Sequence, residues 1–156
     1  MSDKKDFYRT LPQKRMGAGA LFWDKNGRIL LVHPTYKPTW EIPGGIIETD
    51  ESPRACCQRE VKEELGLAVE IGRLLVVEYT EKTADKTESL MFVFAGKELS
   101  TAEIDQIKLP ADELDQAIFF FPDQLPEEMT PTLRNRVSAA WDRLQENRDV
   151  YMENGT

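Results

Sequence analysis

The chain has 156 residues, 40% of them hydrophobic and 31% charged, so it is long enough to bury one core and predicts a single folded domain. Its formal net charge of -8 opposes binding to the phosphate backbone of DNA or RNA, although a small phosphate ligand carried by metal ions escapes that objection. The single histidine excludes a His-rich zinc site. The adjacent Cys56 and Cys57 offer neither a disulfide framework nor a CxxC metal pair.

The N-terminal arm, residues 1–16, is polar and lacks the apolar core of a signal peptide. No apolar run in the chain approaches the roughly 18 residues that a membrane span needs. We therefore expect no membrane contact and a cytoplasmic location.

The chain after this arm begins with short predicted strands. Apolar runs over residues 17–24 and 28–34 flank Asn26 and Gly27, a pair typical of β-hairpin turns. A loop, a short strand and a break in regular structure are then expected, at residues 35–39, 40–42 and 43–45 in turn.

The clearest predicted element is a helix over residues 53–65. Ser52 is a suitable N-cap, Pro53 suits the first helical position, and Gly66 suits a left-handed stop. Its apolar residues are spaced four apart: Cys57, Val61 and Leu65. This stripe predicts which face of the helix is buried.

The rest of the chain predicts strands and a final helix. Residues 67–80 and 90–95 are strand-forming runs joined by a polar hairpin loop, and residues 117–122 form another buried strand. Residues 131–147 carry an apolar helical face. An irregular stretch and a fraying end are expected at residues 97–114 and 148–156.

This order of elements predicts an α+β fold, an α/β/α sandwich in which helices cover both faces of a mixed sheet. The chain contains no internal repeat and no interdomain linker. We therefore place one domain at residues 17–147, between the N-terminal arm of residues 1–16 and a C-terminal tail of residues 148–156.

Three glutamates of the predicted helix are placed where their negative charges repel one another. Glu60, Glu63 and Glu64 fall at i, i+3 and i+4, so they share one helix face. Like charges at this spacing cost about 0.2–0.5 kcal/mol per pair, and the negative end of the helix dipole adds to the repulsion. A cation bound between the glutamates would turn this repulsion into attraction. Glu64 lies beside the apolar stripe, so we expect its carboxylate to be partly desolvated.

The spacing of residues 45–67 resembles the signature of the Nudix hydrolases, GX5EX7REUXEEXGU with U aliphatic. Every specified position is filled: Gly45, Glu51, Arg59, Glu60, Val61, Glu63, Glu64, Gly66 and Leu67. The preceding segment, residues 40–44, also resembles the family, and the order of strands and helices over most of the chain is compatible with its fold.

The resemblance implies Mg²⁺ or Mn²⁺ as cofactor, because hard divalent cations prefer oxygen ligands and bridge carboxylates to substrate phosphates. Glu60 and Glu64 would be the principal metal ligands, joined by Glu63 and by the carbonyl oxygen of Gly44. Four other positions of the signature would be structural, with Arg59 orienting a glutamate and pairing with Glu51: Gly45, Glu51, Arg59 and Gly66.

The general base is left open by the resemblance, since family members use either a glutamate of the signature or an acid outside it. The catalytic candidates are Glu63 and Glu64 within the signature and Glu113 outside it. Glu64 and Glu113 lead, and Glu113 is favoured because it precedes the strand at residues 117–122. Three other acids stay possible: Glu78, Asp112 and Asp115.

Substrate contacts are predicted before the signature. The position of His33 resembles one that is often basic in the family, and it predicts a phosphate contact as the alternative to a polar strand end. Tyr36 and Lys37 could stack on a base or touch phosphate, the alternative being a solvated loop.

The resemblance implies hydrolysis of a pyrophosphate bond in a nucleoside diphosphate linked to another moiety, by water attack at phosphorus. A nucleoside triphosphate, modified nucleotide, dinucleoside polyphosphate or nucleotide sugar all stay open, while the proline that marks many ADP-ribose hydrolases and the coenzyme A signature are absent. The alternatives are a non-catalytic nucleotide-sensing domain and a prenyl-diphosphate isomerase. Dimers are common in the family, so a homodimer is also open.

Overall fold

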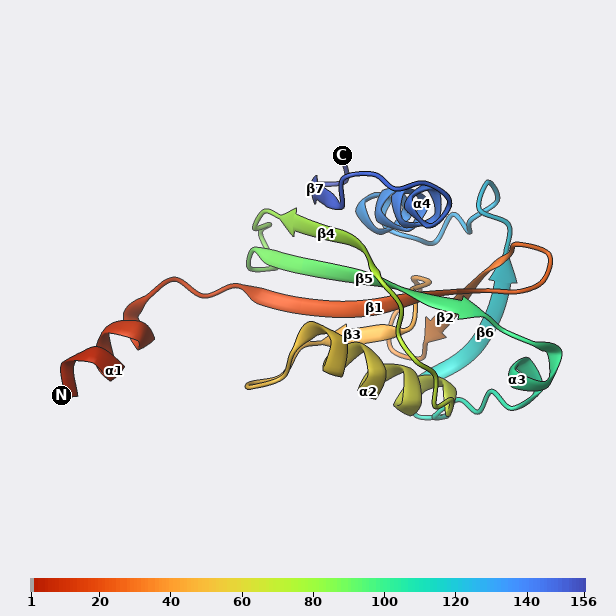
Figure 1. Ribbon diagram of the computed structural model, residues 1–156, viewed down its shortest axis with the longest axis horizontal. Coiled ribbons are helices and arrows are strands. Elements are labelled where there is room, and N and C mark those ends of the chain that lie inside the picture. Colours follow the sequence, from red (N-terminus) through yellow and green to blue (C-terminus); the bar gives the residue numbers. More distant parts are fainter. Residues whose placement is uncertain (1) are drawn as a thin grey trace.

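The computed structural model of the protein describes residues 2–156, with side chains described from residue 4. Within this range, seven strands form one mixed sheet in the order β6-β2-β1-β5-β4-β7, and β3 pairs with β1. Figure 1 shows α2 on one face of the sheet and α4 on the other, which confirms the α+β sandwich. The strands are β1 (Arg15–Trp23), β2 (Ile29–Pro34), β3 (Gly44–Ile46), β4 (Leu74–Thr80), β5 (Ser89–Glu98), β6 (Leu114–Phe120) and β7 (Tyr151–Glu153). The helices are α1 (Ser2–Thr10), α2 (Pro53–Leu65), α3 (Thr101–Asp105) and α4 (Pro131–Gln145).

Side chains alternate between two cores, one on each face of the sheet. In β1, Ala20 and Phe22 belong to the core under α2, whereas Leu21 belongs to the core under α4. The stripe predicted for α2 is buried as expected, because Val61 and Leu65 are no more than 1% exposed. The buried stripe therefore fixes the rotation of α2 about its own axis as it packs on the sheet.

The predicted hairpin between β1 and β2 is confirmed. The two strands are antiparallel, and Gly27 adopts a φ of 73°, which favours glycine. The buried Asp24 carboxylate accepts hydrogen bonds from the backbone N–H groups of Asn26 and Arg28, at 3.0 and 2.9 Å. The turn is thus closed by one side chain as well as by its glycine.

The segment before α2 differs from the prediction. The expected strand at residues 40–42 is reduced to one bridge between Glu41 and Val32, and the expected break at residues 43–45 is instead the start of β3. β3 pairs antiparallel with β1, with Gly44 opposite Gly19. A Cβ on Gly44 would lie 2.4 Å from the carbonyl oxygen of Ala18, so this pairing requires glycine.

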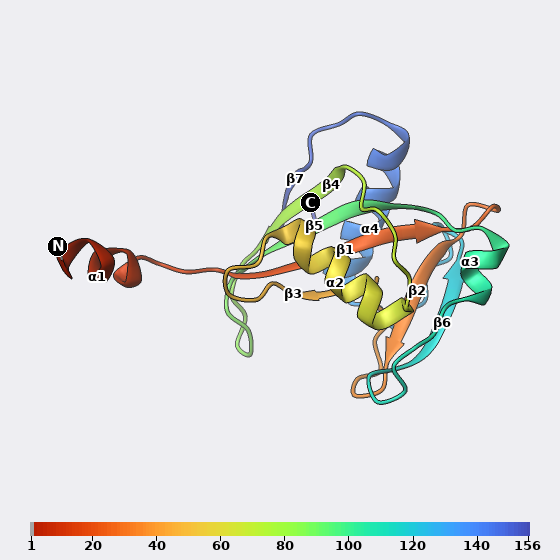
Figure 2. The same ribbon diagram turned by 60° about the horizontal axis from the view of Figure 1, so that its bottom comes forward.

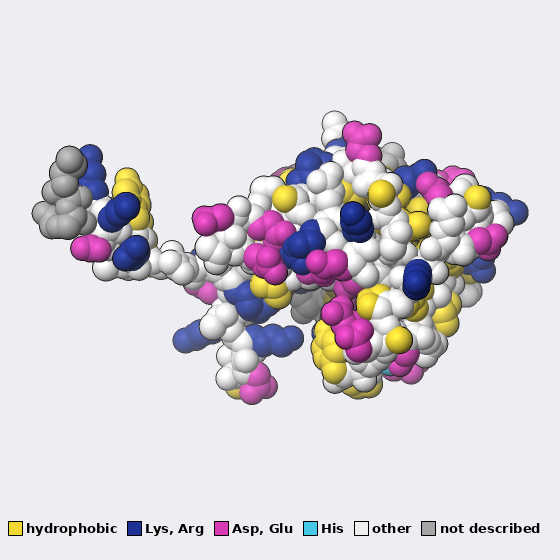
Figure 3. All heavy atoms as spheres, turned by 90° about the horizontal axis from the view of Figure 1, so that it is seen from below, with side chains coloured by type: hydrophobic (Ala, Val, Ile, Leu, Met, Phe, Trp, Pro, Cys, Tyr) yellow, Lys and Arg dark blue, Asp and Glu magenta, His cyan; other side chains and the backbone are white. Residues whose placement is uncertain are grey.

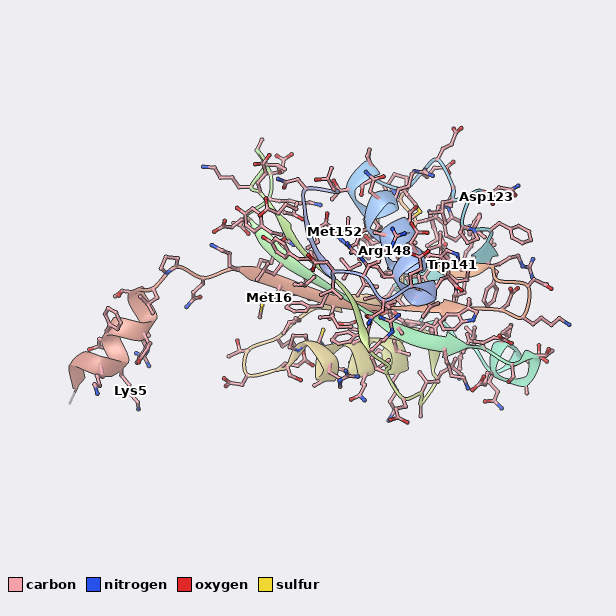
Figure 4. The ribbon with its side chains drawn as sticks, turned by 45° about the horizontal axis from the view of Figure 1, so that its top comes forward. Lys5, Met16, Asp123, Trp141, Arg148 and Met152 are labelled. Carbon is pink, nitrogen blue, oxygen red and sulfur yellow. The ribbon has the colours of Figure 1, made fainter. Side chains whose placement is uncertain are left out.

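The two ends of the chain also differ from the prediction. Residues 2–10 form α1, which stands away from the sheet at the end of an extended segment (Figure 2). The tail expected to fray contains β7, which pairs in parallel with β4. Met152 of β7 is buried in the same core as Trp141 of α4, and Figure 4 shows both on the α4 side of the sheet.

Other boundaries shift by a few residues. The strand predicted from residue 67 begins at Leu74, and the irregular stretch at residues 97–114 contains α3, which has a capping box formed by Ser100 and Glu103. β6 begins at Leu114 instead of residue 117. No helix among residues 2–156 combines the length and apolar composition that crossing a membrane requires.

Candidate functional site

A cavity of about 1150 Å³ extends from the glutamates of α2 to the start of α4. Five carboxylates line it: Glu41, Glu48, Glu60, Glu64 and Glu113. Cationic side chains also line it: Arg15, Lys37, Lys86 and Arg136. Figure 3 shows acidic side chains gathering on the face that α2 covers. The lining of the cavity therefore carries both acidic and basic side chains.

The boundaries of α2 position its glutamates. The Ser52 hydroxyl accepts a hydrogen bond from the Ala55 N–H at 3.1 Å, and Gly66 ends the helix with a φ of 69°. Both ends lie where the sequence predicted them. With the stripe of α2 buried, Glu60 and Glu64 are directed to the edge of the cavity.

Glu64 is the most strongly perturbed carboxylate of the cavity. Burial, helped by the negative charges of Glu60 and Glu41, raises its pKa to about 8, although a hydrogen bond from the Gly44 N–H opposes the shift. That N–H lies 3.0 Å from Glu64 Oε2. Without a cation, the Glu64 carboxyl therefore holds a proton at neutral pH.

Glu60 lies against the glycine-rich strand β3. A Cβ on Gly45 would come within 2.4 Å of Glu60 Oε1, so glycine at this position makes room for the carboxylate. Burial raises the pKa of Glu60, while Arg59 opposes the rise. Arg59 Nη1 donates to Glu60 Oε1 at 2.7 Å.

Arg59 also forms a bidentate pair with Glu51. Its Nε and Nη2 donate to the two Glu51 carboxylate oxygens at 2.7 and 2.9 Å. The hydrogen bonds from Arg59 lower the pKa of Glu51 to about 2. These contacts are the ones that the predicted structural roles of Arg59 and Glu51 need, because they join the loop before α2 to the helix.

The predicted metal ligands are only partly brought together. The Glu63 side chain is 54% exposed and its carboxylate lies 3.4 Å from Arg59 Nη1. Gly44 contacts α2 through its N–H, which donates to Glu64 Oε2, and not through its carbonyl oxygen. Among residues 4–156, no set of three or more acidic, histidine or cysteine side chains is arranged to hold a metal ion.

Glu60 and Glu64 nevertheless have the chemistry of a cation site. Burial raises the pKa of both carboxylates, and the negative charge of Glu60 adds to the rise at Glu64. A hard divalent cation would remove that repulsion through oxygen ligands. The donor set therefore fits Mg²⁺ or Mn²⁺ at these two residues.

Glu113 is placed differently from the other acids considered as general base. It lines the cavity, and its charge contributes to the raised pKa of both Glu60 and Glu64, so it faces them. Asp115 instead pairs with His33, at 2.8 Å from its Nδ1, and Glu78 is fully buried beside Arg136. The cavity-lining residues of the described chain do not include Glu78, Asp112 or Asp115.

The predicted substrate contacts divide into two groups. Tyr36 and Lys37 line the cavity, and Lys37 forms an ion pair with Glu41. His33 is outside the cavity lining and lies edge-on to Trp40, with ring centroids 5.1 Å apart. Sequence reasoning did not select five other charged residues of the lining: Arg15, Glu41, Glu48, Lys86 and Arg136.

Residues 13–146 match a family model described as NUDIX domain. The chain belongs to the Nudix family. The resemblance carried by residues 45–67 is thereby confirmed, and the match covers nearly all of the sheet and both helices that sandwich it.

Individual Nudix relatives cover the chain to different extents. A MutT-like protein of Streptomyces ambofaciens is 44% identical over 50 residues, which are 32% of this chain and 32% of that protein. The structure of a MutT NUDIX hydrolase from Burkholderia pseudomallei is 28% identical with a TM-score of 0.68, covering 85% of this chain and 99% of that one. The structure of a UDP-X diphosphatase has a TM-score of 0.73 at 24% identity, covering 97% of this chain and 75% of that one, and shows the shared fold. The chain thus spans about a third of the Streptomyces protein.

The raised pKa of Glu64 predicts an unusual pH dependence of stability. Between the ordinary value of 4.5 and about 8, the folded protein binds a proton that the unfolded chain releases. The free energy of unfolding of the metal-free protein should therefore fall as pH rises through this window. Urea unfolding at about pH 6 and about pH 8 measures the difference. Glu64→Gln, which keeps the size but cannot ionise, should remove most of it, and an equal pH dependence in the variant would contradict this assignment.

Proposed function

We propose that the protein is a Nudix pyrophosphohydrolase that requires Mg²⁺ or Mn²⁺ and cleaves a nucleoside diphosphate linked to another moiety. The observation that carries the proposal is the pair of desolvated carboxylates, Glu60 and Glu64, on the rim of a cavity that also carries cations. A bound divalent cation would neutralise phosphate charge and lower the pKa of the attacking water. Glu60 and Glu64 would hold it, with Glu63 and the Gly44 carbonyl as the further predicted ligands.

The protein's own residues have separate tasks in this proposal. Arg59 and Glu51 keep Glu60 in place through the contacts described above. Glu113 accepts the proton of the attacking water, or Glu64 does so, because both face the same space. Tyr36 and Lys37 contact the substrate from the loop that precedes the Nudix signature. The signature, residues 45–67, is called the box below.

The arrangement of the cysteines weighs against a prenyl-diphosphate isomerase that uses a thiol. Cys56 and Cys57 are fully buried, and burial raises the pKa of their thiols to about 11 and about 12. A thiol with such a pKa is a poor nucleophile at neutral pH, and neither cysteine is among the described residues that line the cavity. Hydrolysis is therefore the better-supported reaction. A cytoplasmic location and a homodimer belong to the same proposal.

The deciding experiment is a substrate panel with and without Mg²⁺ or Mn²⁺. The panel contains nucleoside triphosphates, modified nucleotides, dinucleoside polyphosphates and nucleotide sugars, and products are identified by mass spectrometry. Reaction in isotopically labelled water should place the label on a phosphate oxygen of the product, because the water attacks phosphorus. Metal-dependent binding without turnover of any compound would instead indicate a nucleotide-sensing domain.

A further inference from the structure

The α4 side of the cavity contains a buried ion pair far from the box in sequence. Glu78 of β4 is 0% exposed, and one of its carboxylate oxygens accepts a hydrogen bond from Nε of Arg136 in α4. The other oxygen accepts the Gly155 N–H at 2.6 Å. Both oxygens of Glu78 are therefore satisfied, and the pair fixes the position of the Arg136 guanidinium.

Arg136 has donors left over in this position. Its side chain is only 12% exposed and lines the cavity. Within residues 4–156, Arg136 forms its hydrogen bond and ion pair with Glu78 through Nε, and neither involves Nη1 or Nη2. Neither Nη atom is among the buried side-chain atoms of the described residues that lack a partner, and Arg136 lines the cavity, so both Nη groups are available to donate to a ligand there.

Thr80 gives a second, independent sign of a ligand at this place. Its Oγ1 is buried, and no hydrogen-bond partner for it exists among the described residues. Thr80 lies two residues after Glu78 in β4, so both side chains point to the same face of the sheet. Thr80 also lines the cavity. Thr80 and Arg136 line the same cavity, and a ligand bound there would supply the acceptor or donor that the Thr80 hydroxyl lacks.

The charges around Arg136 and Thr80 favour an anionic ligand. Across the sheet, Thr80 is opposite Ser89 and Ser89 is opposite Arg15, so Arg15 lies in the same cross-strand row. Lys86, from the hairpin loop between β4 and β5, lines the same cavity. Glu78 cancels the charge of Arg136 alone, so Arg15 and Lys86 leave this end of the cavity positive. A phosphate group suits it.

The distance between the Glu60 end and the Arg136 end of the cavity determines which part of the substrate could bear that phosphate. The strands between them are β3, β1, β5 and β4, since β3 and β5 both pair with β1 and β4 pairs with β5. Three inter-strand spacings amount to roughly 14 Å. A diphosphate held at the Glu60 end therefore does not fill the Arg136 end. That end receives a group from a remote part of the substrate.

We propose that Arg136, held by Glu78, forms with Thr80 a specificity-determining site for a phosphate group remote from the scissile diphosphate. The inference rests on the proposed function, because it takes the Glu60 end to be the site of hydrolysis. Arg136 and Thr80 contact the substrate in this assignment, whereas Glu78 is a positioning residue.

Binding of inorganic tripolyphosphate without divalent cations tests the site separately from catalysis, since the uncompensated carboxylates repel this probe from the other end. Arg136→Lys keeps a cation beside Glu78 but loses both Nη groups, so calorimetry should show binding weakened by about tenfold or more. Arg143→Lys is the matched control: Arg143 is on the same helix, hydrogen-bonds the Val150 carbonyl and does not line the cavity. Its affinity should stay within about twofold of the unchanged protein. Equal affinities for all three proteins, or no binding of the probe, would overturn the site.

Thr80→Val provides a second test that does not depend on the ion pair. Removing an unpartnered buried hydroxyl should leave the unfolding midpoint unchanged or higher, while tripolyphosphate binding weakens by about threefold or more. A Thr80→Val protein that binds the probe as tightly as the unchanged protein would contradict the role of the hydroxyl.

Turnover of two matched dinucleotides links the site to specificity. Diadenosine hexaphosphate and diadenosine triphosphate carry the same nucleosides, but only the longer chain has phosphates far from a diphosphate held at the Glu60 end, so the unchanged protein should prefer the hexaphosphate in kcat/KM and Arg136→Lys should lose that preference. Arg136-dependent probe binding without hydrolysis of any substrate would disprove the proposed function and leave the anion site standing. Hydrolysis with Arg136-independent probe binding and no preference for the longer phosphate chain would overturn the anion site and leave the proposed function standing.

Discussion

Glu64→Gln is expected to reduce hydrolysis by about a thousandfold or more when kcat/KM is measured with the substrate identified in the panel. Glutamine keeps an oxygen that can accept the Gly44 N–H, so the local fold is retained. It removes the negative charge that would hold a divalent cation, and it also removes one of the two candidate bases. The thermal midpoint of the metal-free variant should be equal or higher, because a raised carboxyl pKa opposes folding at neutral pH.

Two further substitutions separate the roles that Glu64 combines. Glu63→Gln should cost much less activity, since Glu63 is 54% exposed and turned to Arg59.

Glu113→Gln should lower kcat and abolish the acidic limb of the pH–rate profile if Glu113 accepts the proton, while leaving the affinity for Mn²⁺ unchanged. Full activity in Glu64→Gln would refute the catalytic reading of this site.

The part of the site on α2 could be predicted because local signals determine it. Ser52 and Gly66 set the ends of the helix, and the buried stripe sets its rotation, all within residues 52–66. Once these are known, the faces of Glu60 and Glu64 follow from the helical period. The direction in which each carboxylate group points was less predictable, because Arg59 competes for it. Glu63 accordingly contacts Arg59 and does not join a cluster with the other two.

The strand β3 was missed for a different reason. Its residues include Gly44 and Gly45, which sequence reasoning interprets as a break in regular structure. They pair with β1 because Gly19 lies opposite Gly44, and the close approach of these backbones leaves no room for side chains. A glycine signal that predicts a turn locally can therefore mark strand contact when the partner strand is also glycine-rich.

The Arg136 end of the cavity depends on contacts distant in sequence. Glu78 and Arg136 are 58 residues apart, and the Gly155 N–H that completes the pair comes from the tail expected to fray. A weak signal was present, because Glu78 alternates with the buried Val76 in a strand. An acid on a core face predicts a buried partner, but the sequence does not say which of many arginines supplies it.

Arg136→Met is expected to lower the free energy of unfolding by about 3–5 kcal/mol, because it leaves the buried Glu78 carboxylate without its cation. The remaining Gly155 N–H satisfies one oxygen but cannot neutralise the charge. Urea unfolding monitored by tryptophan fluorescence measures the change, with the m-value checking that the transition stays two-state.

The double variant Glu78→Met with Arg136→Met shows whether the loss comes from the unpaired charge or from the packing of the arginine stem. Replacing both members of a buried pair by apolar side chains is often close to neutral, so the double variant should recover most of the stability. Arg148→Met is the surface control, because its ion pair with Glu146 is 61% and 57% exposed and should contribute within about 1 kcal/mol. A single variant as stable as this control would mean that Glu78 does not depend on Arg136. A double variant as unstable as Arg136→Met would place the cost in packing, since no buried charge would then be left to explain it.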